Sequence, residues 1–534
     1  MKSIKARLNI TSYQIPPTVL CVFIISVFSL FGFIIMSLAT NNGLGLSVDS
    51  MSYVDSARNL LQGKGFASFS GNGHFPPFYP MLLAVSGIFF NNILDGAAIL
   101  HALLFCVNIA FAGYIMFRES GNSLIAACLA SIVILTSPTM LNVHSMAWSE
   151  PLFLLLSVAG LYLLSNYLKS FKKKTLAGAA ILTALAVLTR YAGVANVAAG
   201  CVAIIFLSRQ QTKQKVFGVL IFSVLSVLPI SLWVFKNYLL AGSVVNRGFS
   251  FHPIDAKYVT DAVSTLAAWF YLPPDTLFSI KLCFVLLIIV VVIISVIFLF
   301  RKQTRNFSTK QNPSFSYLPI IALIFSFSYI LMLFINSTFF DAHTPFDDRI
   351  LSPLLLIGFL GTLNCILSLI RESPQRIAIL FYVFLSGFVM MQFLTTTVFL
   401  SEIHAEGRGY ARKDIKELIV IKMIKSLPSG TLIYSNGPDA MFFLTGREIK
   451  MIPLKVSPTT RQANEHFEDE LKRMWKKINN ESGILVILNF IEWRWYLPDK
   501  KELEQKLSLQ IHYQGQDGTI YKADASPFLD ERLD

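Results

Sequence analysis

Long apolar stretches alternate with short polar loops between Thr18 and about Leu400, and the character of the chain then changes. The stretches are roughly twenty residues long, the length that a helix needs to cross about 30 Å of hydrocarbon. They predict an all-α polytopic membrane protein with about eleven transmembrane helices. From Ala405 onward charges are dense and no stretch is long enough to span. We therefore divide the chain into a transmembrane domain, residues 1–404, and a C-terminal domain, residues 405–534.

The pattern of the C-terminal part predicts a small α/β domain. The stretches TLIYS and GILVIL suit buried strands, and SNGPD and LTGR supply turn residues. Four apolar residues suit one face of a single helix: Ile415, Leu418, Ile419 and Ile424. No nucleotide-binding glycine pattern is present in the sequence of this part.

Basic clusters mark cytoplasmic loops and so predict the topology. These clusters are Lys2/Lys5/Arg7, Lys169/Lys172/Lys173/Lys174, Arg209/Lys213/Lys215, Arg301/Lys302/Arg305/Lys310 and Arg371/Arg376. Five apolar stretches separate the first two clusters, so one of the five must not cross. Phe78–Asn91 is short and follows Pro76 and Pro77, which predicts a juxtamembrane helix in the first outer loop. The first loop (residues 39–96) and the C-terminal domain are then extracytoplasmic, in a multi-pass protein of the plasma membrane.

Composition agrees with a membrane protein and argues against a nucleic-acid partner. The 534 residues are 54% hydrophobic and only 14% charged. The net charge is +13, but the C-terminal part is nearly neutral, so the basic excess belongs to the inner loops. All six cysteines lie in apolar stretches, which argues against a disulfide framework or a cysteine metal site.

Ionisable residues are almost absent from the predicted spans, His101 being the main exception. This argues against a proton or substrate pathway through the bilayer. Acids, histidines and cations collect instead in the outer loops, which predicts a site at the outer membrane surface. The candidates are Asp49, Asp55, His74, Glu150, Arg247, His252, Lys257, Asp347, Asp348 and Arg349.

Five segments in order, over roughly residues 40 to 360, resemble the GT-C glycosyltransferases. They are DSMSYVDSARNLLQGKGF, HFPPFYPMLLA, WSEPLFLLL, LTRYAG and FDDRILSPLLL. The resemblance is to the group that includes protein O-mannosyltransferases and the aminoarabinose transferases that modify lipid A. It implies a GT-C-like integral-membrane glycosyltransferase that moves a sugar from a polyprenyl-phosphate donor to a glycan, lipid or protein acceptor. It also implies a catalytic aspartate in the first loop, a second acid near the second outer loop, and often a divalent metal.

The residues that match these roles can be named. A leaving phosphate requires a cation or a metal, and an acceptor requires a carboxylate base on the opposite side of the anomeric carbon, so displacement inverts that centre. Asp49 fits the base and Glu150 the second acid, while Arg349 fits the phosphate-binding cation. Further substrate-binding candidates are Arg247, His252 and Tyr53, and His74 is the candidate ligand of a divalent metal of open identity.

Each assignment has a structural alternative. For Asp49 it is an N-cap, and for Glu150 it is stabilisation of a helix N-terminus. For Arg349 it is local pairing with Asp347 or Asp348, or anchoring at the headgroups. Asp55 fits a solvated helix face, His74 a surface loop, and Arg190 an interfacial anchor. The alternative functions are a transporter of lipid or solute, and a non-catalytic membrane subunit with a ligand-binding tail.

Overall fold

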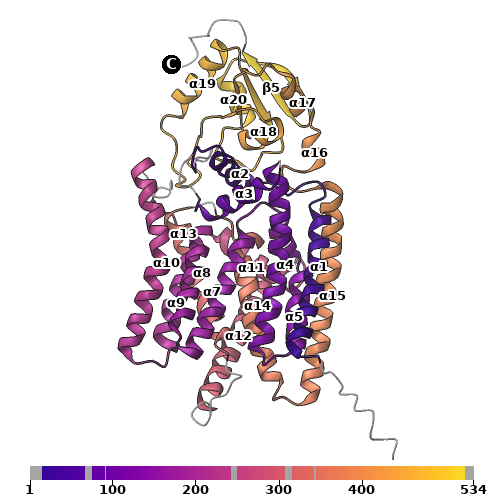
Figure 1. Cartoon of the computed structure of the whole chain (residues 1–534). Coiled ribbons are helices and arrows are strands. Elements are labelled where there is room, and N and C mark those ends of the chain that lie inside the picture. The colour runs from indigo at the N-terminus through magenta and orange to yellow at the C-terminus, as the bar shows by residue number, and fades with distance from the viewer. Residues whose placement is uncertain are drawn as a thin grey trace, which may run out of the picture.

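A computed structural model gives the fold of the chain, a bundle of long helices that carries a small α/β domain at one end (Figure 1). The structure describes residues 15–66, 75–90, 92–241, 249–306, 316–341 and 344–523.

The named elements of the N-terminal part, within the described residues, are all helices. Its elements are α1 (Pro17–Ala39), α2 (Val48–Leu61), α3 (Phe78–Ile88), α4 (Ile93–Glu119), α5 (Leu124–Leu135), α6 (Pro138–His144), α7 (Glu150–Ser170), α8 (Lys173–Thr189), the 3₁₀ helix η1 (Tyr191–Gly193), α9 (Val194–Leu207), α10 (Thr212–Ala241), α11 (Ala256–Ala268), α12 (Phe278–Asn306), α13 (Leu318–Phe339), α14 (Asp348–Ile370) and α15 (Gln375–Glu406).

Eight of the described helices are long and apolar enough to cross a membrane: α1, α4, α7, α10, α12, α13, α14 and α15. The bent pair α5 and α6 makes nine if it counts as one span. The chain is thus a polytopic membrane protein, as expected. The expected count of eleven requires α5, α8 and α9 to cross as well, and it stays a prediction.

Helix α3 has 11 residues and begins after Pro77. At a rise of 1.5 Å per residue it is about 16 Å long, too short to cross the hydrocarbon. Helices α2 and α3 lie together at the end of the bundle that faces the C-terminal domain (Figure 1). The stretch that follows Pro76 and Pro77 therefore forms a short helix in the loop between α1 and α4, as the topology argument predicted.

Residues of two predicted basic clusters lie at the end of the bundle opposite the C-terminal domain, where α4, α7 and α14 end. Lys169 at the end of α7 lies 2.7 Å from the carboxylate of Glu119 at the end of α4. Arg371, which follows α14, donates to the carbonyl oxygen of Ser120. These contacts bring distant basic clusters to one end, away from Asp49 and the C-terminal domain.

The C-terminal domain is built on a five-stranded sheet of order β2-β1-β3-β5-β4. Its elements are α16 (Lys413–Lys416), α17 (Ile419–Ser426), β1 (Ile433–Ser435), α18 (Pro438–Thr445), β2 (Lys450–Met451), α19 (Phe467–Asn480), β3 (Ile484–Leu488), α20 (Lys500–Lys506), β4 (Leu509–Gln514) and β5 (Gly518–Ala523). Strand β1 runs parallel to β2 and β3, and β5 runs antiparallel to β3 and β4. All five residues of β3 are buried, so this strand is the centre of the domain.

The single helix predicted through Ile415 and Ile424 is wrong. Leu418 has an extended ψ of 135°, which separates α16 from α17. The break rotates the second helix, so its buried residues are Val420, Ile421 and Ile424, while Ile419 is 55% exposed.

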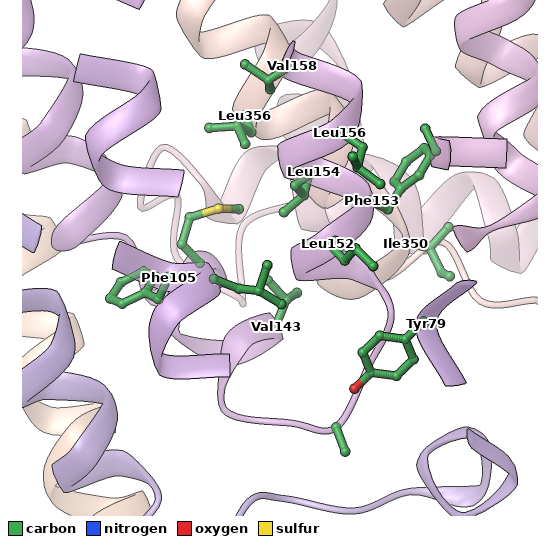
Figure 2. Packing of buried hydrophobic residues seen from close by; sticks show 14 of the residues in the cluster. Tyr79, Phe105, Val143, Leu152, Phe153, Leu154, Leu156, Val158, Ile350 and Leu356 are labelled. Carbon is green, nitrogen blue, oxygen red and sulfur yellow. The ribbon is translucent and has the colours of Figure 1, made fainter. Parts of the chain in front are cut away.

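The hydrophobic core extends directly under the end of the bundle that carries α2 and α3. Side chains from α3, α4, α6, α7 and α14 interdigitate there, among them Tyr79, Phe105, Val143, Phe153 and Ile350 (Figure 2). Such a core is close-packed and resists displacement of its helices. It fixes the first residues of α7 and α14 relative to each other.

Candidate active site

Asp49 lies in the first turn of α2, and Ser47 caps this helix. The Ser47 hydroxyl accepts the backbone N–H of Ser50 at 3.5 Å and the indole N–H of Trp148 at 2.9 Å. The capping alternative for Asp49 is therefore wrong. The Asp49 side chain is 35% exposed, which leaves its carboxylate accessible from solvent.

Glu150 is the first residue of α7, and its side chain is only 1% exposed. Its Oε1 accepts from Nε of Arg349 and from Nη1 of Arg190, each at 2.5 Å. Its Oε2 is buried, and among the described residues it has no hydrogen-bond partner. A carboxylate held in this way is stabilised by both guanidinium groups and is shielded from solvent.

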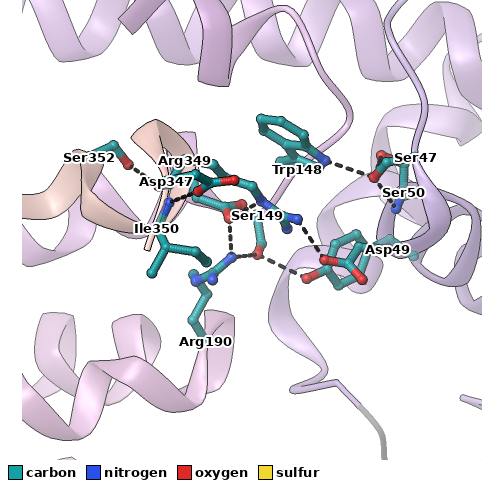
Figure 3. Close-up of polar contacts among 12 residues, drawn as sticks. Ser47, Asp49, Ser50, Trp148, Ser149, Arg190, Asp347, Arg349, Ile350 and Ser352 are labelled. Atoms are coloured by element: carbon teal, nitrogen blue, oxygen red, sulfur yellow. Dashed lines mark hydrogen bonds and ion pairs between the residues drawn. The ribbon is translucent and has the colours of Figure 1, made fainter. Parts of the chain in front are cut away.

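Arg349 joins the two acids, and Figure 3 shows it directed toward Asp49. Its Nη1 lies 2.7 Å from Oδ2 of Asp49, while its Nε binds Glu150. The guanidinium stacks on the Trp148 ring at 4.3 Å from the centroid. The planar fork of arginine allows this double engagement, which a lysine ammonium does not reproduce.

The two acids beside Arg349 in sequence have other roles. Asp347 caps α14 by accepting the N–H of Ile350 at 3.0 Å. Asp348 accepts from the Thr139 hydroxyl at 2.8 Å and from the Trp269 indole at 2.7 Å. These contacts favour long-range pairing of Arg349 over the local alternative.

Arg190 was interpreted as an interfacial anchor, and that interpretation is wrong. It stands in extended conformation between α8 and η1, with a side chain that is 16% exposed. It donates to Glu150 and, at 3.1 Å, to the hydroxyl of Ser149. The sequence contained a signal for this role. An arginine that follows an apolar helix at its outer end lies at the same depth relative to the membrane as the acids of the outer loops.

A second layer of side chains holds this cluster. Tyr53 is 2% exposed, with its hydroxyl 3.1 Å from Oγ of Ser149, and burial raises the pKa of this tyrosine above its usual range. Its ring contacts Tyr79, whose hydroxyl lies 2.7 Å from Nε2 of His101. His101 in turn lies 2.9 Å from the carbonyl oxygen of His144. Tyr53 thus supports the site from behind, and His101 links α3, α4 and α6.

The structure does not bring every candidate to this cluster. His252 is 7% exposed, and within the described residues neither of its ring nitrogens has a hydrogen-bond partner. Its backbone N–H binds the carbonyl of Thr338 at 3.0 Å. Arg247 and His74 lie outside the described residues.

The described residues of the site do not fit a divalent metal. Across the described ranges no group of three His, Cys, Asp or Glu side chains could hold one. The carboxylates of Asp49 and Glu150 are engaged by guanidinium groups, which stand where a cation would. The metal predicted with His74 as a ligand stays a prediction, since His74 lies outside the described residues.

The chemistry that this arrangement allows follows from its charges. Asp49, Arg349, Glu150 and Arg190 form a chain of alternating sign, with Asp49 as the solvent-accessible end. A carboxylate at such a position accepts a proton, and the adjacent guanidinium stabilises an anion. Burial of Glu150 keeps the two guanidinium groups in fixed positions.

Solved structures share this fold. The chain is similar to ArnT from Cupriavidus metallidurans in the apo state, with 13% identity, 93% of this chain and 97% of that chain covered, and a TM-score of 0.57. It is similar to the same protein bound to undecaprenyl phosphate, with 12% identity, 94% and 98% covered, and a TM-score of 0.56. It is also similar to the archaeal oligosaccharyltransferase AglB from Archaeoglobus fulgidus in complex with an inhibitory peptide and a dolichol-phosphate, with 12% identity, 96% and 75% covered, and a TM-score of 0.51.

These similarities confirm the expected GT-C-like fold. No protein-family model matches the chain, and no curated protein matches it by sequence.

Proposed function

We propose that the protein is a membrane glycosyltransferase that moves a sugar from a polyprenyl-phosphate donor to an acceptor at the outer face of the membrane. The observation that carries the proposal is the accessible Asp49 carboxylate bound to Arg349 and backed by the buried Glu150. The fold supports it, since ArnT binds undecaprenyl phosphate and AglB a dolichol-phosphate.

In the proposed reaction Asp49 is the general base. Its carboxylate takes the proton of the acceptor hydroxyl or amine as that atom forms a bond to the anomeric carbon. The bond between the anomeric carbon and the phosphate oxygen breaks, and the polyprenyl phosphate leaves with the electron pair. As the donor binds, the guanidinium of Arg349 exchanges its 2.7 Å contact with Asp49 for the phosphate oxygens on the far side of the anomeric carbon, where it stabilises the negative charge of the leaving phosphate. A single displacement of this kind inverts the anomeric centre.

Glu150 takes a different role from the catalytic one first expected. A carboxylate that is 1% exposed and bound by two guanidinium groups does not reach an acceptor. We assign it as a positioning residue that anchors Arg349 through Nε and so keeps its guanidinium at the site. Arg190 shares the charge of Glu150 and supports the same arrangement.

The proposed orientation follows from charge. Lys169 and Arg371, from two basic clusters, lie at the end of the bundle away from Asp49, and basic loops are retained in the cytoplasm. Asp49 and the C-terminal domain then lie on the extracytoplasmic side of the plasma membrane. The lipid tail of the donor holds the sugar just above the headgroups. Asp49, which shortly follows the span α1, lies at the same level.

The proposal is tested with purified protein and a panel of radiolabelled polyprenyl-phosphate sugars in membrane extract. We expect one donor to be consumed and its label to appear in a glycan, lipid or protein product, which identifies the acceptor class. Uptake of the labelled lipid into vesicles without cleavage of the sugar would support the transporter alternative instead. No consumption and no uptake would favour the non-catalytic subunit.

A further inference from the structure

Three chain segments that are far apart in sequence meet immediately before the two acids of the site. Gly45 pairs with Met146, and Leu46 pairs with Gly409, in two short parallel β-bridges. The first two segments lead into α2 and α7, which carry the acids. The third, residues 407–411, leaves α15 and enters the C-terminal domain, and we name it the strap.

Backbone hydrogen bonds join the three segments. The N–H of Tyr410 in the strap donates to the carbonyl of Leu46 at 3.0 Å. The N–H of Gly45 donates to the carbonyl of Ser145 at 2.9 Å, and the N–H of Ala147 donates to the carbonyl of Gly45 at 2.8 Å. A shift of the strap therefore displaces the backbone ahead of both acids.

The fit of the strap is close enough to require glycine. Gly409 has a φ of +51°, and a β-carbon there would collide with the carbonyl oxygen of Leu46. A β-carbon at Gly45 would collide with Sδ of Met146 and would lie 2.8 Å from Cβ of Arg408. The backbones approach more closely than side chains at these positions would allow.

The side chain of Arg408 binds the strap to the last turn of α6 and to the loop between α6 and α7. Its Nη1 donates to Oδ1 of Asn142 and, at 3.3 Å, to Oγ of Ser145. The guanidinium lies over the Phe399 ring, 5.0 Å from the centroid. Burial lowers the pKa of Arg408 to about 10, so the group is still charged at neutral pH.

The other end of the strap is fastened inside the C-terminal domain. The Tyr410 hydroxyl donates to Oδ2 of Asp439 at 2.7 Å, and burial raises its pKa well above the usual range, so it stays a donor. Oδ1 of Asp439 binds Arg494 at 2.6 Å, with both side chains 1% exposed. Arg494 also donates to the carbonyl of Asn436 at 2.9 Å, at the end of β1. The strap is thus tied to the core of the sheet.

We propose that the C-terminal domain sets the position of the catalytic base through this strap, with Tyr410 as the positioning residue. Tyr410 holds the domain through its hydroxyl and the loop before Asp49 through its N–H. The inference rests on the proposed function, since it assumes that Asp49 is the base. The domain also touches α2 where Arg58 lies over the Phe442 ring, 5.8 Å from the centroid, and that contact does not involve the strap.

The matched pair of variants is Tyr410→Phe and Tyr513→Phe. Each removes one tyrosine hydroxyl that donates to an aspartate of the same domain, since Tyr513 donates to Asp517 at 2.9 Å from the edge strand β4. Donor transfer is measured as kcat and KM, and hydrogen–deuterium exchange is measured for peptides that cover residues 43–53. Both are compared with the unaltered full-length protein in the same detergent.

We expect Tyr410→Phe to raise amide exchange in residues 43–53 and to lower kcat on the order of tenfold, with KM for the donor little changed. A displacement of a catalytic group by about 1 Å costs up to about a hundredfold in rate. Tyr513→Phe should leave both quantities at the unaltered level. Gly409→Ala should increase exchange further, because it forces the strap away from Leu46.

Two outcomes overturn the inference. One is unaltered exchange and unaltered kcat in Tyr410→Phe, and the other is an equal change in Tyr513→Phe, which means general loosening of the domain. The exchange measurement requires no activity. If Asp49→Asn transfers sugar normally while Tyr410→Phe still raises exchange in residues 43–53, the assignment of the base fails and the mechanical link stands.

Discussion

Replacing Asp49 by asparagine separates catalysis from structure at the central residue of the site. Asparagine keeps the size of the side chain but removes the negative charge and the basic oxygen. The ion pair of 2.7 Å with Arg349 is lost, whereas Arg349 keeps its bond to Glu150. The cap of α2 is untouched because Ser47 provides it.

The cost in stability is expected to be small. The Asp49 side chain is 35% exposed, and ion pairs of such exposure contribute about 0–1 kcal/mol. The cost in rate is expected to be large. Loss of a general base typically lowers turnover by about 10²- to 10⁴-fold, which corresponds to roughly 3–5 kcal/mol in the activation barrier.

The assay compares initial rates of label transfer from the polyprenyl-phosphate donor with thermal unfolding of the same preparations in detergent. Asp49→Asn should unfold at nearly the unaltered temperature and transfer at most about one hundredth as fast. Asp55→Asn, on the next turn of the same helix, is the control and should affect both quantities mildly.

Two results contradict this reasoning. Normal turnover in Asp49→Asn with an inactive Asp55→Asn would move the base to another position on α2. A fall in unfolding temperature that accounts for the loss of turnover in Asp49→Asn would make the residue structural.

Three further predictions concern the charge cluster, the metal and the topology. Glu150→Gln leaves Arg349 and Arg190 without their buried counter-charge. The free energy of unfolding, measured in a denaturant series, should therefore fall by about 3–5 kcal/mol. A loss below about 1 kcal/mol, the range of exposed ion pairs, would contradict the buried pairing. Treatment with EDTA tests the metal predicted at His74 against Arg349 as the cation at the phosphate: unchanged transfer would agree with Arg349, and loss of activity restored by a divalent ion would establish the metal. In single-cysteine variants, a membrane-impermeant thiol reagent should label exposed Lys64→Cys from outside and label Lys172→Cys only after permeabilisation, and the reverse pattern would invert the topology.

Local features of the sequence predicted the outline of the architecture, although they missed the break between α16 and α17. Apolar length predicted the long helices, and the shortness of the stretch after Pro76 and Pro77 predicted that α3 does not cross. The alternation of apolar segments and turn residues predicted an α/β domain after α15. These features depend on hydrocarbon thickness and backbone geometry, which act on each segment separately.

The same local information limited what could be said about the site. Polar residues in outer loops identified Asp49, Glu150 and Arg349 as candidates, since charges are costly in hydrocarbon. Nothing in the pattern separated an accessible acid from a buried one. That difference depends on the packing around α2 and α7, where the Asp49 side chain is 35% exposed and that of Glu150 only 1%.

Only the tertiary structure decided which charges pair. Arg349 reaches Glu150 across 199 positions of sequence, and Arg190 reaches it from the end of a different helix. The strap joins Gly409 to Leu46 through backbone atoms. Backbone contacts do not require particular side chains, so the only sign of this contact in the sequence is the glycines at positions 45 and 409. A hydrophobic pattern specifies which face of a helix is buried, but the partner of a charged side chain depends on the distances and crossing angles at which the helices pack.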